Sequence, residues 1–514
     1  MTSNSQTIIQ DIRQEFEMLI EFVTGEQVQK VTADQLERSL FSLLLALGAK
    51  LLALFFVVRS ERCCRETIET AKGQKLPYDR DRKRDYFSIF GKIPLWRPYF
   101  YKKNVGGASP LDEELGLGDD CYSDLVREIS DYLGVYNVYH KSGDILRRLL
   151  GLNLSTRVIE ETIAKDAVDV EVYYAQKPAP KPQTEAEILV IQVDGKGVPL
   201  IYDDPLPSKP VRLGKGQKRG RKKEAIVTTG YTIAPQPRTP QEVVDSFFDQ
   251  KETKEKGSYP KPQNKHVWAT LDGKDTALDR LLKQVANREG EHIQHRAALC
   301  DGCEALQTRI EDRFDTFTLI LDFIHADEYL WDVANSLLGE TYPRRLAWMK
   351  EHTLQILSGQ TEQLIANFRQ MAQDSQYSAT QQAQLTKTAN YFERNLPYMN
   401  YPAYLQLGWP IASGVIEGAC RHFVKDRCEL SGMRWEQSGV ESLLRLRAVA
   451  ENDDWDDYHH FRKHQRHLRL YNSTYPELSL LELQAIEAKT TTAQAEPILA
   501  ANNSKRYHQL PLGA

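Results

Sequence analysis

The stretch ILVIQVDGKGV, residues 188–198, constrains the fold more than any other part of the sequence. Five of its first six residues are apolar, and four of these five are β-branched. Such a run is typical of a strand buried on both faces of a sheet. The strand leads into Asp194, and burying a lone carboxylate is unfavourable unless a cation or hydrogen-bond donors accompany it. From this stretch alone two interpretations stay open: a turn built on Asp-Gly, or the first ligand of a divalent metal.

Length and charge bound the class of protein. The chain has 514 residues, enough for about three domains of ordinary size. Its net charge of -5 argues against a uniformly basic nucleic-acid-binding surface and leaves room for local basic patches. Seven cysteines, an odd number spread over a long chain, do not indicate a disulfide framework. We therefore expect a protein of the reducing cytoplasm.

Residues 1–75 are predicted to be helical. The apolar segment 40–58 is long enough to cross a bilayer, but it carries Lys50 near its middle, where a charge is costly in lipid. The helical pattern also continues on both sides of the segment. We therefore expect a buried or helix-pairing segment that serves oligomerisation, with no membrane contact. A membrane anchor is the alternative.

Residues 76–176 are predicted to form a DNA-binding region. Two aromatic runs separated by Gly-Lys-Ile-Pro predict a β-hairpin within 76–107. Basic residues interleaved with the aromatic ones suit nucleic acid, and equally suit a small sheet with a solvated basic face. Residues 121–175 have the pattern of three short helices, which fits a helix-turn-helix unit or a generic helical bundle. The Pro-rich stretch 177–187 is predicted to be a linker.

Residues 188–452 are predicted to be the catalytic core. The expected order after the linker is strand, strand, strand, helix, strand, strand, helix, which is the order of an RNase H-like fold. Residues 340–397 have an almost wholly helical pattern and are interpreted as an insertion before the last helix. Residues 453–514 are predicted to be a polar C-terminal tail. The expected class is α/β, with a mixed sheet and mainly helical DNA-binding elements and a β-hairpin before it.

Three acids stand out by their context. Asp194 and Asp301 each end a predicted strand and precede a glycine, and Glu417 lies near the start of a predicted helix. Three carboxylates at one end of a sheet can hold two Mg²⁺ ions, or Mn²⁺ in their place, for phosphodiester chemistry. Asp322 also ends an apolar strand and is the rival of Asp301 as second metal ligand. The sequence leaves that choice open.

Positively charged residues expected to contact DNA fall in two runs. The run within 207–223 is either a flexible solvated loop or a clamp on a phosphate backbone. The second run follows Glu417, where Arg421 either contacts DNA or pairs with that glutamate. Trp435 either stacks on a base or packs in the core. The predicted DNA-binding residues are Lys215, Lys218, Arg219, Arg221, Lys222, Lys223, Arg421, Lys425, Arg427, Arg434 and Trp435.

Five stretches carry a resemblance to a known family. The chain resembles the DDE-type transposases of bacterial insertion sequences, in particular the ISKra type, over most of residues 80–455. The longest of the matching stretches is also the most specific. They are PLDEELGLGDDCYSD (110–124), VDGKGVPL (193–200), LCDGCEAL (299–306), LILDFIHADEYLWDVA (319–334) and SGVIEGACRHFVKDRCELSGMRW (413–435).

The resemblance implies an activity and the residues that perform it. It implies Mg²⁺-dependent cleavage and strand transfer of DNA at terminal inverted repeats, with Asp194, Asp301 and Glu417 as the catalytic triad. It also implicates Asp322 and His325. His325 would contact the scissile phosphate or orient a carboxylate that binds metal. The alternative is that His325 is an ordinary residue at the edge of the core. Many relatives carry cysteine pairs in the aromatic hairpin, and residues 100–107 have none, so zinc is not expected there.

The partners and rivals follow from the same resemblance. The expected partners are the terminal repeats, target DNA and further copies of the chain, in the bacterial cytoplasm at the nucleoid. One alternative is an RNase H-like nuclease that cuts without joining. Another is a catalytically idle, domesticated DNA-binding relative, which the presence of all three acids disfavours.

Overall fold

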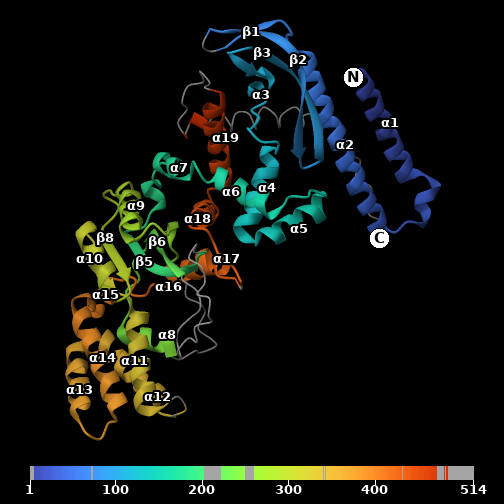
Figure 1. The fold of residues 1–514 in the computed structure, drawn as a ribbon. Helices are drawn as coiled ribbons and strands as arrows, with labels where there is room; N and C mark the ends of the chain where they lie inside the picture. The colour runs from blue at the N-terminus through green and yellow to red at the C-terminus, as the bar shows by residue number, and fades with distance from the viewer. Residues whose placement is uncertain are drawn as a thin grey trace, which may run out of the picture. The chain divides into compact units, whose positions relative to one another are not determined.

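The computed structural model describes residues 5–70, 73–201, 222–248, 260–339, 341, 343–430, 432–471, 480, 482 and 483. The chain folds into two compact units (Figure 1). Unit 1 combines residues 1–177 with 454–514, and unit 2 comprises residues 178–453. The predicted α/β class is confirmed at a coarse level. N-terminal helices and an antiparallel sheet come first, followed by a five-strand mixed sheet and a largely helical C-terminal region.

Unit 1 begins with an antiparallel pair of helices, α1 (Ser5–Thr24) and α2 (Ala33–Glu61). Thr32 and Gln35 cap the start of α2 reciprocally, each side chain accepting a hydrogen bond from the other's backbone N–H. The Ser5 N–H donates to Glu61 at 3.1 Å, which joins the start of α1 to the end of α2. Among the described residues, α2 is the one helix long and apolar enough to cross a membrane by length and composition.

The predicted β-hairpin is confirmed. Strands β2 (Lys75–Ser88) and β3 (Gly91–Lys102) pair antiparallel up to Ser88 and Gly91, and β1 (Thr67–Glu69) and β4 (Gly106–Ala108) complete the sheet. Ile93 and Leu95 alternate along β3 and pack against Phe56 of α2. This small core fixes the second half of α2 on the sheet.

The predicted helices between residues 121 and 175 are present, and α19 joins them in unit 1. The chain beyond residue 453 was expected to be a polar tail, but it begins with α19, in which Arg462 and His459 are 1% exposed. The polar composition misleads because Asp124 and Asp166 neutralise the arginines inside the unit. Unit 1 also contains the short helix α3 (Pro110–Glu114), and the helices after it are α4 (Asp124–Tyr136), α5 (Tyr139–Leu150), α6 (Thr156–Asp166), α7 (Val170–Gln176) and α19 (Trp455–Tyr471).

Unit 2 is built on a five-stranded sheet in the order β7-β6-β5-β8-β9. Its central strand, β5, is the predicted buried strand, with Ile188 through Val193 each no more than 1% exposed. The strand pairs parallel with β8 and antiparallel with β6, and β9 continues the parallel half. The strands are β5 (Ile188–Pro199), β6 (Lys222–Ile233), β7 (Gln263–Thr270), β8 (His295–Cys300) and β9 (Thr318–Leu321).

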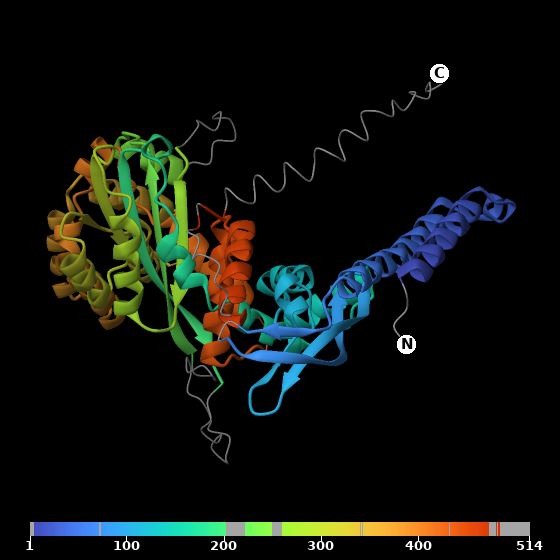
Figure 2. The same ribbon diagram turned by 90° about the horizontal axis from the view of Figure 1, so that it is seen from above.

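Helices cover both faces of this sheet, as the alternation of side chains along β5 requires (Figure 2). Leu189 and Ile191 face α9 and α10, whereas Ile188 and Val190 face the core shared with α8 and α11 to α15. The segment predicted as a helical insertion forms three helices. The helices of unit 2 are α8 (Pro240–Phe248), α9 (Lys274–Ala286), α10 (Glu304–Arg313), α11 (Phe323–Leu338), α12 (Arg345–Leu357), α13 (Thr361–Gln373), α14 (Ala379–Asn395), α15 (Tyr401–Gln406), α16 (Gly414–Gly418), α17 (Asp426–Cys428) and α18 (Gln437–Glu451).

Candidate metal centre

The register of the parallel strands places three aspartates in one row. Val193 of β5 lies opposite Cys300 of β8, and Cys300 lies opposite Leu321 of β9. The next residue along the chain is Asp194 within β5, Asp301 directly after β8 and Asp322 directly after β9. Residues in register on parallel strands point to the same face, and neighbouring strands lie about 4.8 Å apart. The three carboxylates therefore start from adjacent positions on one face of the sheet.

Asp194 is held by two donors. Its Oδ1 accepts a hydrogen bond from the Gly195 N–H at 2.6 Å, and its Oδ2 accepts one from the Cys420 thiol at 3.2 Å. Burial, followed by the charge of Asp194, raises the pKa of the Cys420 thiol, so the sulfur stays protonated and donates. Asp194 is half-buried and keeps acceptor capacity for a cation.

Asp301 begins the turn that leads into α10. Its Oδ1 accepts a hydrogen bond from the Cys303 N–H at 3.1 Å, which fixes the carboxylate at the end of β8. Burial raises the pKa of Asp301, and the negative charge of Asp194 raises it further. Like charges this close favour a cation between them.

Asp322 has a different environment. It is fully buried, and each oxygen has two polar neighbours on the chain. Oδ1 accepts from the backbone N–H groups of Ile324 at 3.3 Å and Ser413 at 2.9 Å. Oδ2 accepts from the Ser413 hydroxyl at 2.7 Å and lies 2.5 Å from Nδ1 of His325. A carboxylate with four such neighbours has little capacity left for a metal, so Asp322 acts as an anchor for the residues around it.

His325 is oriented by this anchor. The hydrogen bond to Asp322, followed by the charge of that carboxylate, raises the pKa of His325 to about 9 although burial opposes the shift. At neutral pH the ring is therefore protonated, with Nδ1 engaged by Asp322. The Nε2–H remains as a donor for an anionic group.

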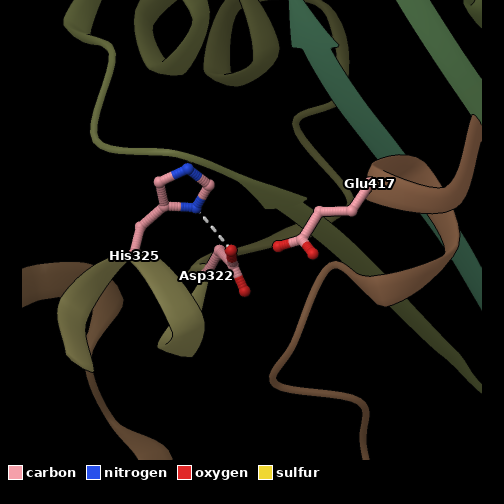
Figure 3. Close-up of side chains that lie close together, drawn as sticks. All are labelled: Asp322, His325 and Glu417. Atoms are coloured by element: carbon pink, nitrogen blue, oxygen red, sulfur yellow. Dashed lines mark hydrogen bonds and ion pairs between the residues drawn. The ribbon is translucent and has the colours of Figure 1, made fainter. Parts of the chain in front are cut away.

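Three buried hydrogen bonds position Glu417. The Ser413 contacts with Asp322 hold the chain just before α16, and the side-chain oxygen of Gln192 accepts from the Ile416 N–H at 2.9 Å. The α16 helix passes directly into a π-helical segment, Ala419–Lys425, a local widening that is frequent at functional sites. One ligand atom each from Asp322, His325 and Glu417 lie within 4.8 Å of one another, and Figure 3 shows the Glu417 carboxylate directed toward Asp322.

The donor set fits a hard divalent cation. Asp194, Asp301 and Glu417 supply carboxylate oxygens from three separate elements, and oxygen is the ligand that Mg²⁺ and Mn²⁺ prefer. Within the described residues these three acids carry fewer chain contacts than Asp322 does. Asp194, Asp301 and Glu417 could therefore hold a cation, whereas the oxygens of Asp322 are engaged by the chain even though Asp322 lies in the group of close ligand atoms with His325 and Glu417.

The basic residues expected at DNA divide into three groups. Lys215, Lys218, Arg219 and Arg221 lie outside the described residues. Arg421, Lys425 and Arg434 are exposed, while Lys222 and Lys223 contact Glu429 and Gln437. Of the described ion pairs, none joins Arg421 to Glu417. These exposed side chains remain candidates for phosphate contact.

Arg427 and Trp435 correct the prediction. Arg427 is 1% exposed and lies over the Trp435 ring at 5.0 Å, and the Trp435 indole N–H donates to the Cys428 carbonyl at 3.0 Å. Both side chains are packed inside unit 2, where DNA does not reach them. A cation next to an aromatic ring suits stacking on a base, but it equally forms a buried cation–π pair.

Sequence reasoning missed the residues that support the acids. Gln192 is the one polar residue in the apolar run before Asp194 and lies two positions from it, on the same face of β5. That position was a signal for a buried polar contact. Cys420 follows Glu417 by one helical turn. Ser413 lies 91 residues from Asp322 in the sequence, so the contact between them could not be read from a local pattern. Comparison with protein-family models and with curated proteins gave no significant match.

Proposed function

We propose that the chain is a DDE-type transposase with an RNase H-like catalytic core in unit 2. The observation that carries this proposal is the placement of Asp194 and Asp301 in register on adjacent parallel strands, with Glu417 brought to the same edge by Gln192 and Asp322. A sheet with two antiparallel pairings, β7–β6 and β6–β5, beside two parallel ones supports the proposed core. The family resemblance of the flanking sequence supports the same assignment.

The residues present divide the chemistry among them. Asp194, Asp301 and Glu417 would hold two Mg²⁺ ions, which when bound activate the attacking oxygen and stabilise the leaving oxygen of a phosphodiester. Asp322 fixes the ring of His325, whose Nε2–H donates to a phosphate oxygen and adds positive charge beside it. The Cys420 thiol holds Asp194 in place. Cleavage frees a 3′-hydroxyl at the element end, and that hydroxyl then attacks target DNA in line.

DNA recognition is assigned to the hairpin and helices of unit 1. Trp96 is 41% exposed on β3, and Tyr101, which stacks on Tyr99, is 45% exposed, so both rings are accessible to a nucleic acid. The Arg82 guanidinium lies 5.2 Å from the Tyr99 ring on the same sheet. Aromatic and basic side chains on one ribbon provide stacking and phosphate contacts. Helices α4 to α6 bind the terminal repeats together with this hairpin.

A strand-transfer assay tests the function. The full chain is incubated with Mg²⁺, labelled DNA from the borders of its own reading frame, and a supercoiled target. We expect cleaved ends and joined product from the native chain, neither from Glu417→Gln, and both from Asp315→Asn, a matched change at an exposed acid. Cleaved ends without joined product would favour the nuclease alternative. Binding without cleavage would favour the idle relative.

A further inference from the structure

The α1–α2 hairpin carries an exposed apolar face. Nine large apolar side chains on these helices are 40–56% exposed. A monomeric soluble protein rarely leaves so many large apolar side chains together in water. Met18 and Leu43 lie at other angles around their helices. The seven that share one side are Phe16, Ile20 and Val23 on α1, and Phe41, Leu44, Leu51 and Phe55 on α2.

Helix geometry places both sets on the same side of the hairpin. Glu15 and Lys50 form an ion pair across the hairpin, so these two residues mark the facing sides of α1 and α2. The next residue on each helix, Phe16 or Leu51, is turned by about 100° in the same sense along the chain. Because the helices run antiparallel, both turns lead to the same side. The seven side chains therefore form one continuous face.

The opposite side of α2 is already occupied. Ala49, Leu52 and Phe56 pack against the sheet, and the ring of Phe90 lies so close to Gly48 that a Cβ there would be 2.6 Å from it. Only the part of α2 before Gly48 is free of the sheet, a length of roughly 22 Å, whereas a bilayer core needs about 30 Å. The packing therefore argues against lipid as the partner of this face.

Spacing along the face favours a helical partner. The three residues of this face on α1 are separated by four and three positions, and its four residues on α2 by three, seven and four. These steps keep a period of 3.5, the repeat with which helices pack in left-handed bundles. At roughly 100 Å² for each half-exposed large side chain, the face offers about 700 Å² per copy, close to the ~800 Å² that each partner buries in a standard interface.

We propose that this face binds the same face of a second copy of the chain, so that two α1–α2 hairpins form a four-helix bundle about a twofold axis. Each hairpin carries the same two rows of apolar side chains, one on α1 and one on α2. A twofold axis brings such a surface against an identical copy of itself. The assembly is thus made by unit 1. The proposal does not depend on the proposed chemistry of unit 2.

Light scattering coupled to size exclusion tests the proposal with the full chain and single charge insertions. We expect a dimer for the native chain and at least a tenfold weaker association for Ile20→Glu and for Leu44→Glu. Met18→Glu is the matched control because Met18 is 50% exposed, against 51% for Ile20, and lies on the other side of α1. Circular dichroism confirms that each variant keeps its helices.

Three results would overturn the proposal. One is a monomeric native chain at micromolar concentration. Another is a dimer that Ile20→Glu and Leu44→Glu leave as stable as Met18→Glu does. The third is co-sedimentation of the native chain with phosphatidylcholine vesicles that Ile20→Glu abolishes, which would make lipid the partner. Cleavage and joining by unit 2 are measured separately, so failure here is distinguishable from failure of the proposed function.

Discussion

The carboxamide of Gln192 on the central strand β5 accepts a hydrogen bond from the backbone N–H of Ile416 at 2.9 Å. Its amide nitrogen donates to the Tyr231 hydroxyl at 3.0 Å, so the completely buried side chain is satisfied at both ends. Ile416 immediately precedes Glu417. One buried glutamine thus connects the strand that carries Asp194 to the helix that carries Glu417, the two acids that we propose as ligands of one metal site.

Replacing Gln192 with leucine is expected to lower strand cleavage more than stability alone explains. The change leaves the Ile416 N–H and the Tyr231 hydroxyl without this partner in the core, at a stability cost of about 1–3 kcal/mol for an unsatisfied group. It also frees the start of α16, so we expect at least a tenfold loss of cleavage rate. Kinetics of the folded fraction, with urea unfolding alongside, measure both effects.

Gln307→Leu is the matched control for that change. Gln307 is 4% exposed in the same unit and donates to Asn395 at 2.7 Å, but it contacts neither α16 nor β5. A comparable loss of stability with near-native cleavage by the folded fraction is expected. Equal loss of cleavage in both variants would show that Gln192 acts through stability alone.

Asp301→Asn and Asp322→Asn are expected to fail in different ways. Asp301 has few chain partners, so removing its charge should weaken Mn²⁺ binding by tenfold or more and change stability little. Asp322 has four polar neighbours, and an amide in its place would turn an NH₂ group toward donors. We expect Asp322→Asn to lower the free energy of unfolding by about 1–3 kcal/mol even in the absence of metal.

Electron paramagnetic resonance of Mn²⁺ and chemical unfolding of the metal-free chain separate the two roles. If Asp322→Asn lost Mn²⁺ affinity at unchanged stability while Asp301→Asn kept its affinity, the assignment of ligand and anchor would have to be exchanged. Glu417→Gln serves as a positive control for loss of affinity.

The sequence predicted the strands of the metal centre because their patterns are local. The apolar run before Asp194, the glycines after Asp194 and Asp301, and the helical pattern around Glu417 each depend on a few neighbouring residues. The sequence left the choice between Asp301 and Asp322 open, and local patterns could not predict the contact of Asp322 with Ser413, which spans 91 residues. The buried helix α19 was missed for the same reason, since its arginines are neutralised by distant aspartates.

The stability of unit 2 is expected to fall as the pH rises through about 6. Burial raises the pKa of Asp327 to about 6, although the Thr353 hydroxyl donates to it at 2.8 Å and favours the charged form. Between about pH 4 and 6 the folded chain holds a proton that the unfolded chain has released, so stability decreases with rising pH. At about 1.4 kcal/mol per pKa unit, the loss is at most about 3 kcal/mol.

Asp327→Asn removes this dependence. The amide cannot ionise and keeps an oxygen for the Thr353 hydroxyl, so the variant should be more stable than the native chain at about pH 7.5. Urea unfolding at about pH 4.5, 6 and 7.5 gives the slope for each protein. Parallel slopes for the two proteins would mean that Asp327 does not titrate in this range.

Two arginines of unit 1, Arg462 on α19 and Arg157 on α6, should differ sharply in their contribution to its stability. Arg462 is 1% exposed and pairs with Asp166 at 2.7 Å, and Asp166 is also 1% exposed and holds Arg127. Removing one partner of a buried pair leaves an uncompensated charge and typically costs 3–5 kcal/mol, so about that loss is expected for Arg462→Met. Arg157 pairs with Glu161 on α6, and these two side chains are 85% and 55% exposed.

The exposed pair is the internal control for the buried one. Water solvates most of the Arg157 side chain and about half of the Glu161 side chain, so Arg157→Met is expected to leave the free energy of unfolding nearly unchanged. Thermal and urea unfolding of both variants, followed by tryptophan fluorescence, gives the comparison. Similar losses for the two changes would mean that Asp166 remains compensated without Arg462, with Arg127 alone balancing its charge.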